Sequence, residues 1–224
     1  MFRRLAVFAV AASLAASAVS AATPREMLAT AALQTTDKGQ ALQIVKTALA
    51  TTQAQLAANP ADKEAQIQYA VAVGDRAKLT RSPGDAKLAR HLFEQFAAAN
   101  PRDAEGQFAI ACWHLDTVAA GLIPTTVLGA KRDVGLAALN RAVALANGRP
   151  FILGFAALLR IRNDPADVAA ARQLAETAAT APAPTLLDRY GQRAAQTVLG
   201  PLRAGNGAEA ARLAKGLLPF GRLA

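Results

Sequence analysis

The sequence contains very few cysteine, histidine and aromatic residues. Cys112 is the only cysteine among 224 residues, so no intramolecular disulfide can form and the fold must depend on apolar packing. His91 and His114 are the only histidines, and two imidazoles are a poor basis for a metal site. Aromatic residues make up only 5% of a chain rich in alanine, which favours closely packed helices over a bulky core.

The sequence also lacks the patterns expected of most enzymes. There is no alternating strand pattern of useful length, no Gly-rich phosphate loop and no Gly-x-Ser-x-Gly. Cys112, His114 and Asp116 together have the components of an activated thiol. However, a spacing of two residues on a helix rotates successive side chains by about 200°, so the three cannot converge. We therefore predict no catalytic residues, no metal site and no cofactor.

The N-terminus has the pattern of an export signal. Arg3 and Arg4 precede an apolar stretch from Leu5 to Val19, and Val19-Ser20-Ala21 is a small-residue cleavage site. About 15 apolar residues are too few to cross a bilayer, although an uncleaved anchor is the alternative. We expect a signal peptide at 1–21 and a mature domain at 22–224, located in a bacterial periplasm.

The chain carries a formal charge of +9, which falls to +7 when Arg3 and Arg4 are removed. A nucleic-acid partner is not expected in that compartment. The last segment concentrates basic residues with only Asp188 and Glu209 to oppose them, so this segment either contacts anionic lipid headgroups or an acidic partner, or is a solvated surface. These basic residues are Arg189, Arg193, Arg203, Arg212, Lys215 and Arg222.

A four-residue pattern of Asx or Ser, then Pro, then a final Asp occurs four times. Its first residue is expected to cap a helix, the proline to occupy the first helical position and the aspartate to lie near the positive helix end. The four copies begin at Asn59, Ser82, Asn100 and Asp164.

The spacing of these copies predicts a repeating helical hairpin. Asn100 lies 41 residues after Asn59, and Asp164 lies twice that distance after Ser82. The two sets then mark the first and second helices of one unit, which gives an all-α array of about ten helices in five pairs. Helices are expected at 24–33 and 37–59, among others.

Two segments in the middle of the chain stand out. The helix after Asn100 carries Phe108, Ala111 and Leu115 on one stripe and Trp113 on nearly the opposite side, so it should lie between two layers of neighbours. The following segment, 121–129, is too long for a tight turn and too apolar for a solvated loop. It is either a binding element or a cap on the core.

The second helices resemble those of the tetratricopeptide repeat. Ala89, Phe93 and Pro101 fall at the same offsets as Ala170, Leu174 and Pro182, and Ala138, Ala142 and Pro150 form a looser copy. The resemblance implies a right-handed solenoid of antiparallel helix pairs with a concave ligand groove, although the family unit is 34 residues long.

The sequence favours a scaffold or adaptor that binds a protein or peptide in the cell envelope, such as a transporter component. The alternative is a carrier that encloses a lipid or another hydrophobic small molecule. The groove is expected to involve first-helix side chains and the apolar segment. The predicted binding residues are Tyr69, Arg76, Trp113, Leu122, Ile123, Val127, Leu128 and Arg160.

Overall fold

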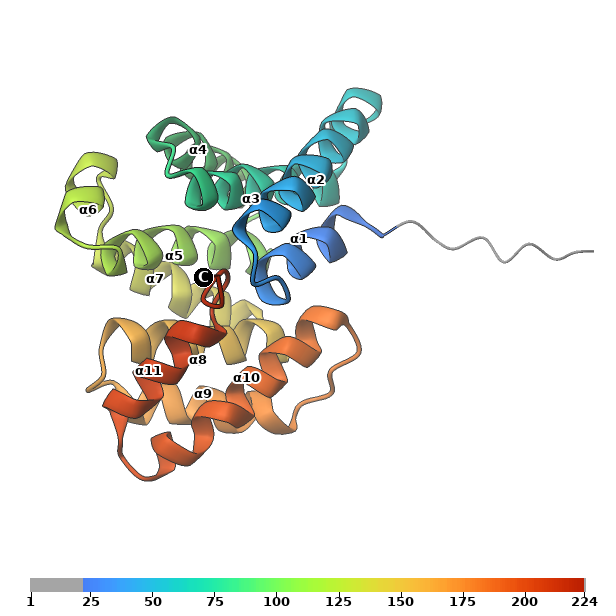
Figure 1. Cartoon of the computed structure of the whole chain (residues 1–224). Helices are drawn as coiled ribbons and strands as arrows, with labels where there is room; N and C mark the ends of the chain where they lie inside the picture. Colours follow the sequence, from blue (N-terminus) through green and yellow to red (C-terminus); the bar gives the residue numbers. More distant parts are fainter. Residues whose placement is uncertain (1–21, 224) are drawn as a thin grey trace, which may run out of the picture.

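The computed structural model describes residues 22–223 as an all-α protein, and no strand occurs among them (Figure 1). None of these helices is both long and apolar enough to cross a membrane. The predicted signal peptide at 1–21 lies outside the described residues. The helices are α1 (Pro24–Leu33), α2 (Lys38–Ala58), α3 (Lys63–Thr80), α4 (Pro83–Ala99), α5 (Ala104–Ala119), α6 (Leu122–Leu128), α7 (Arg132–Leu145), α8 (Pro150–Asn163), α9 (Val168–Thr180), α10 (Leu186–Arg203) and α11 (Gly207–Leu217).

The repeated Pro-containing pattern marks helix junctions, as expected, but three copies are placed differently from the prediction. Asn59, Asn100 and Asp164 end one helix, and the aspartate three residues later begins the next. In all three copies the N–H of that aspartate donates to the carbonyl of the first residue, at 3.0–3.1 Å. This hydrogen bond closes a turn around the proline. Only Ser82 caps the helix directly before its proline.

The segment at 121–129 is a short helix and not a loop. α6 begins after Gly121 and ends at Gly129, both of which have positive φ angles of 113° and 68°. Such angles are readily adopted only by glycine. Between them, the Thr125 and Thr126 hydroxyls donate to carbonyls one turn earlier. The two glycines that indicated a loop in the sequence therefore mark the two ends of a short helix.

Two hydrophobic cores are built on opposite sides of α5, which confirms that this helix lies between two layers. Phe108, Ala111 and Leu115 pack into the core formed with α7–α11. Ala109 and Trp113 pack into the core formed with α1–α4. In Figure 1, α2–α4 lie above α5 and α8–α11 lie below it.

The C-terminal residues return to the first helix. After α11, the backbone N–H of Phe220 donates to the carbonyl of Ala32 in α1 at 2.7 Å, and Leu223 packs against the core that contains α1. The C-terminal segment therefore lies against the last turn of α1, as seen where the red segment approaches that helix (Figure 1).

Two glycines allow α8 and α10 to cross in direct backbone contact. A Cβ atom at Gly154 would lie 2.1 Å from the carbonyl oxygen of Gly191, and one at Gly191 would lie 2.2 Å from that of Pro150. Neither backbone oxygen can yield without moving a helix. The composition predicts close helix packing through small side chains. At this crossing the packing requires glycine, which has no side-chain carbon at all.

We predict that Gly191→Ala destabilises the protein by about 2 kcal/mol or more, because the methyl group forces α10 away from α8. The matched control is Gly216→Ala in α11, where an added Cβ meets nothing within 4 Å. That change should be neutral or stabilising by up to about 1 kcal/mol. Chemical denaturation measures both. Equal effects of the two substitutions would contradict the close crossing.

Candidate functional site

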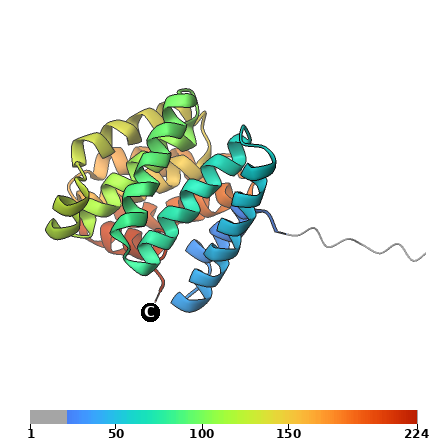
Figure 2. The ribbon, with the colours of Figure 1, turned by 90° about the horizontal axis from the view of Figure 1, so that it is seen from above.

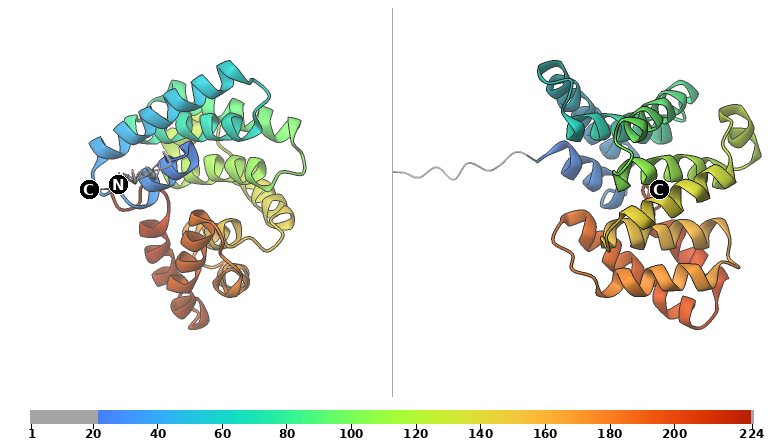
Figure 3. Two further views of the ribbon diagram at one scale, coloured as in Figure 1. Left: turned by 90° about the vertical axis from the view of Figure 1, so that its right-hand side faces the viewer. Right: turned by 180° about the vertical axis from the view of Figure 1, so that it is seen from behind.

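A cleft opens where α1 faces the start of α10, with α5 and α8 at its floor. Its volume is about 460 Å³, within the usual range for ligand sites. The left view of Figure 3 shows this side of the molecule, with α1 above the C-terminal helices. We call it the Glu105 cleft. It is lined by Thr23, Arg25, Glu26, Ala29, Glu105, Arg149, Pro184, Thr185, Leu186, Leu187 and Arg189.

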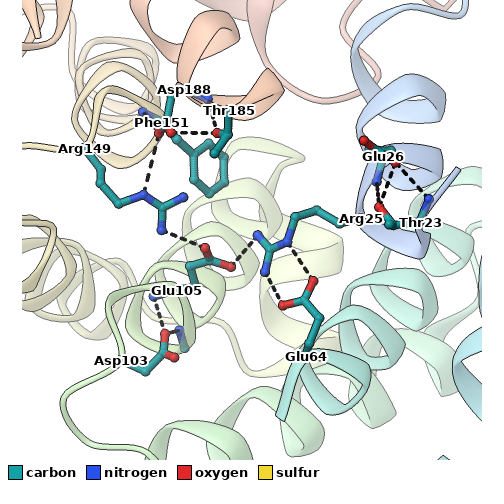
Figure 4. A network of polar contacts seen from close by, with 11 residues as sticks. Thr23, Arg25, Glu26, Glu64, Asp103, Glu105, Arg149, Phe151, Thr185 and Asp188 are labelled. Atoms are coloured by element: carbon teal, nitrogen blue, oxygen red, sulfur yellow. Dashed lines mark hydrogen bonds and ion pairs between the residues drawn. The ribbon is translucent and has the colours of Figure 1, made fainter. Parts of the chain in front are cut away.

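Glu105 bridges two guanidinium groups that come from distant parts of the chain (Figure 4). One carboxylate oxygen accepts from Arg25 Nη1 at 2.7 Å, and the other accepts from Arg149 Nη1 at 2.9 Å. Arg25 also binds Glu64 with two parallel hydrogen bonds of 2.6 and 2.7 Å. Bidentate pairs of this kind fix geometry as well as charge. The network holds α1, α3, α5 and α8 together at the cleft.

Asp188 supplies a cap to a helix that has none of its own. α8 begins with Pro150, and no side chain of Arg149 caps it. The Phe151 N–H donates instead to Asp188 of α10 at 3.4 Å. Asp188 is only 2% exposed and also accepts from the Thr185 hydroxyl at 2.6 Å. A buried carboxylate at a helix start satisfies free N–H groups and complements the helix dipole.

The electrostatics of the cleft favour permanently charged arginines. Burial lowers the pKa of Arg25. The hydrogen bond to Glu64 and the charge of Glu105 raise this pKa by more than burial lowers it, so the net shift is upward. Arg189 is exposed and donates to the carbonyl oxygen of Pro184 at 3.0 Å. Arg25 and Arg149 are already paired with Glu64, Glu105 and Asp188. Of the three arginines in the lining, only Arg189 forms no ion pair within residues 22–223. Such a site can hold a carboxylate or another anion.

The structure places the predicted first-helix residues at several points of the fold, and their binding role stays a prediction. Tyr69 packs beside the N-terminal core. Arg76 binds Asp85 of α4 with hydrogen bonds of 2.7 and 2.8 Å. Arg160 binds Asp167 at 2.7 Å and lines a separate cleft between α7, α8 and α9. Tyr69 and Arg76 line neither that cleft nor the Glu105 cleft.

The apolar residues predicted at 121–129 are largely exposed. Leu122, Ile123 and Val127 are 82%, 78% and 56% exposed, and no residue of α6 is buried. Leu128 is half-buried against the N-terminal core. α6 therefore does not cap the core, and its binding role stays a prediction.

Trp113 is only 7% exposed and supports the structure next to α6. Its indole N–H donates to the carbonyl of Ala86 at 2.8 Å, and the Arg90 guanidinium lies over its ring at 5.3 Å from the centroid. It fastens α5 to α4. The Trp113 ring is therefore packed between α4 and α5, whereas the sequence predicted that it lines a binding groove.

His114 lies on the opposite side of α5 from Cys112 and Asp116. Contrary to the prediction that all three separate, Cys112 and Asp116 are one turn apart on the same face, and burial and the Asp116 charge raise the pKa of the Cys112 thiol. His114 accepts from the Lys131 N–H at its Nδ1, at 3.0 Å. Asp116 faces elsewhere: Lys78 donates to one of its oxygens, and Arg162 lies 2.7 Å from the other. Among residues 22–223, no three metal-ligating side chains gather into a metal site.

The residues of the Glu105 cleft were not predicted as site residues. Glu105 and Asp188 lie in the first turns of α5 and α10, where acidic residues are expected for local helix capping. Arg25 and Arg149 follow no motif. The only sequence feature that pointed to these residues was the position of the two carboxylates at helix starts. That position does not tell which other helix each carboxylate contacts.

No family model, curated protein or solved structure matched the chain in the comparisons with known proteins. Function must therefore be inferred from the geometry of the described residues.

A pH dependence of stability is predicted from Asp75, which is 8% exposed beside the Lys78–Asp116 pair. Burial raises the pKa of its carboxyl from 3.8 to about 7; Lys78 opposes this shift and Asp116 adds to it. The folded protein thus binds this proton more tightly than the unfolded chain. The stability contributed by the neutral form is complete below pH 3.8 and is lost as the pH rises to about 7.

We therefore expect Asp75→Asn to stabilise the protein relative to wild type at pH 8, by up to about 4 kcal/mol. The difference should shrink steadily as the pH falls toward and below 3.8, where Asp75 becomes neutral in both folded and unfolded chains. Urea unfolding of both proteins at several pH values measures the difference in their free energies of unfolding. The contributions of all other titratable groups cancel, because both proteins contain them. A difference that does not change with pH would refute the shifted pKa.

Proposed function

We propose that this protein is an exported helical-repeat scaffold that holds a protein or peptide partner in the cell envelope, and that the partner binds in the Glu105 cleft. The observation that carries the proposal is the preformed arginine–glutamate network at the floor of that cleft. The all-α architecture and the antiparallel packing of neighbours such as α3 with α4 and α8 with α9 are compatible with a divergent tetratricopeptide-like array. The periplasmic location rests on the N-terminal sequence pattern.

The lining of the cleft suits a peptide with both an acidic and an aliphatic group. Arg189 presents positive charge, while Leu186 and Leu187 at the start of α10 present apolar surface. A carboxylate that binds the guanidinium groups would orient the chain, and an aliphatic side chain would add buried area.

The network also favours binding because it is organised before the ligand arrives. Arg25 and Arg149 are held by Glu64, Glu105 and Asp188 at 2.6–3.6 Å. Their side chains therefore lose little conformational freedom when a ligand binds, which reduces the entropic cost of association.

The test is site-specific photo-cross-linking in intact cells. A photoreactive residue at Leu186 should give a discrete cross-linked product, and the same residue at exposed Thr197 of α10 should not. Arg189→Glu should reduce the Leu186 product by about tenfold or more, because a like charge then faces the acidic ligand.

The matched control is Arg193→Glu, which makes the same charge change one turn along α10 and outside the cleft. Arg193 lies over the Tyr190 ring at 4.8 Å and is absent from the lining. Its product should stay near the wild-type level. Absence of a Leu186 product, or equal loss in both variants, would reject the cleft as the partner site.

A second candidate function, a carrier of a hydrophobic small molecule, is favoured by the cleft between α7, α8 and α9. This cleft has a volume of about 320 Å³ and includes the apolar side chains of Val143, Leu153 and Leu174. Native mass spectrometry of protein purified from its own envelope should then detect a retained small ligand. Leu174→Glu should abolish the retained mass. A protein that carries no added mass in native spectra would argue against this function.

A further inference from the structure

α6 projects an apolar surface away from both cores. Its three exposed aliphatic residues, Leu122, Ile123 and Val127, belong to a helix in which no residue is buried. Figures 1 and 2 place α6 at the edge of the molecule opposite the start of α1. Leu88 on neighbouring α4 and Val134 on α7 are also exposed hydrophobic residues. Three large aliphatic side chains exposed together on one short helix mark a contact site.

The two threonine hydroxyls of α6 are satisfied within the helix. The Thr125 hydroxyl donates to the Gly121 carbonyl at 2.7 Å, and the Thr126 hydroxyl donates to the Leu122 carbonyl at 3.0 Å. Pro124 has no backbone N–H to satisfy. Hydroxyls that are already hydrogen-bonded are less costly to remove from water. α6 can therefore enter an apolar environment without leaving these groups unpaired.

Contacts with the body hold this projection in place. Ala130, directly after the helix, is buried in the N-terminal core, and its N–H donates to the Thr125 carbonyl at 3.0 Å. Arg90 of α4 approaches the Gly129 carbonyl at 3.4 Å. α6 is thus presented in one orientation, with its apolar residues outward.

Positive charge flanks an entirely uncharged segment. Residues 117–130 contain no charged side chain, whereas Lys131 and Arg132 follow directly. Lys87 lies three residues before Arg90 and so on the same face of α4. Three acids oppose these four cations: Glu94, Asp133 and Asp164. Arg90 pairs with Glu94 and Arg132 with Asp164, but within residues 22–223 no ion pair forms at Lys87 or Lys131.

We infer that α6 inserts shallowly into the surface of a bilayer that contains anionic lipid, with Lys87 and Lys131 contacting the headgroups. Apolar insertion combined with basic residues is the pair of signals that gives stable but reversible membrane attachment. A typical protein interface buries about 800 Å² on each partner. Three side chains on a seven-residue helix offer much less area, so a charged lipid surface fits the feature better.

The basic C-terminal segment, which the sequence also suggested for lipid contact, is less suited to it. Arg203 pairs with Glu176, and Arg212 pairs with Glu209. Arg193 lies over the ring of Tyr190. These cations have no exposed apolar helix beside them comparable to α6. The inference does not depend on the proposed partner cleft, because the two involve different residues.

The test is an environment-sensitive fluorophore placed on α6 in the full chain. Ile123→Cys in a Cys112→Ala background is labelled with nitrobenzoxadiazole and mixed with vesicles of equimolar phosphatidylcholine and phosphatidylglycerol. The emission at position 123 should shift to the blue and intensify. The same label at Thr197→Cys on α10 should change little. Because the readout is local, attachment through the N-terminal residues does not mimic it.

Charge variants complete the test. Lys87→Glu with Lys131→Glu should weaken the vesicle response at position 123 by about tenfold or more. Lys46→Glu with Lys63→Glu, an equal charge change on exposed positions of α2 and α3, should leave it nearly unchanged. The inference is overturned if position 123 shows no shift, as expected for a protein partner, if pure phosphatidylcholine gives an equal shift, or if the two charge variants behave alike.

Discussion

Both hydrophobic cores of the protein depend on α5, because this helix packs against different helices on its two sides. Phe108, Ala111 and Leu115 belong to the C-terminal core, and Trp113 belongs to the N-terminal core. Ile110 touches both. A helix buried on two faces cannot rotate or shift without disturbing both layers. α5 therefore sets how the two halves of the molecule are placed relative to each other.

Two carboxylates on α5 strengthen this constraint. Glu105 at its start joins α1 to α8 through Arg25 and Arg149, and Asp116 near its end joins α3 to α8 through Lys78 and Arg162. Ion pairs removed from water add little net stability, since desolvation offsets their attraction. Their effect here is on geometry, because any other arrangement of these helices would leave a charge buried without its partner.

The same helix separates the two candidate surfaces. Glu105 lies at the cleft, and α6 follows the opposite end of α5, so about 24 Å of helix stands between them at 1.5 Å per residue. A partner in the cleft and a lipid surface at α6 would not compete for space. This arrangement suits a scaffold, which must present separate surfaces in a fixed relation.

The amino-acid sequence by itself determined most of the helices and the character of the packing, but it missed α6 and placed three of the helix starts at the wrong residue. Pro24–Leu33 was predicted with its observed bounds, and the turns around Pro60, Pro101 and Pro165 were recognised as junctions, because capping and proline geometry act within a few residues. The two-sided burial of α5 also followed from periodicity. Only the tertiary structure decided which helices meet at Glu105, that α8 and α10 touch at Gly154 and Gly191, and that α6 is exposed. These features depend on contacts between residues far apart in the chain, and local patterns carry no record of such contacts.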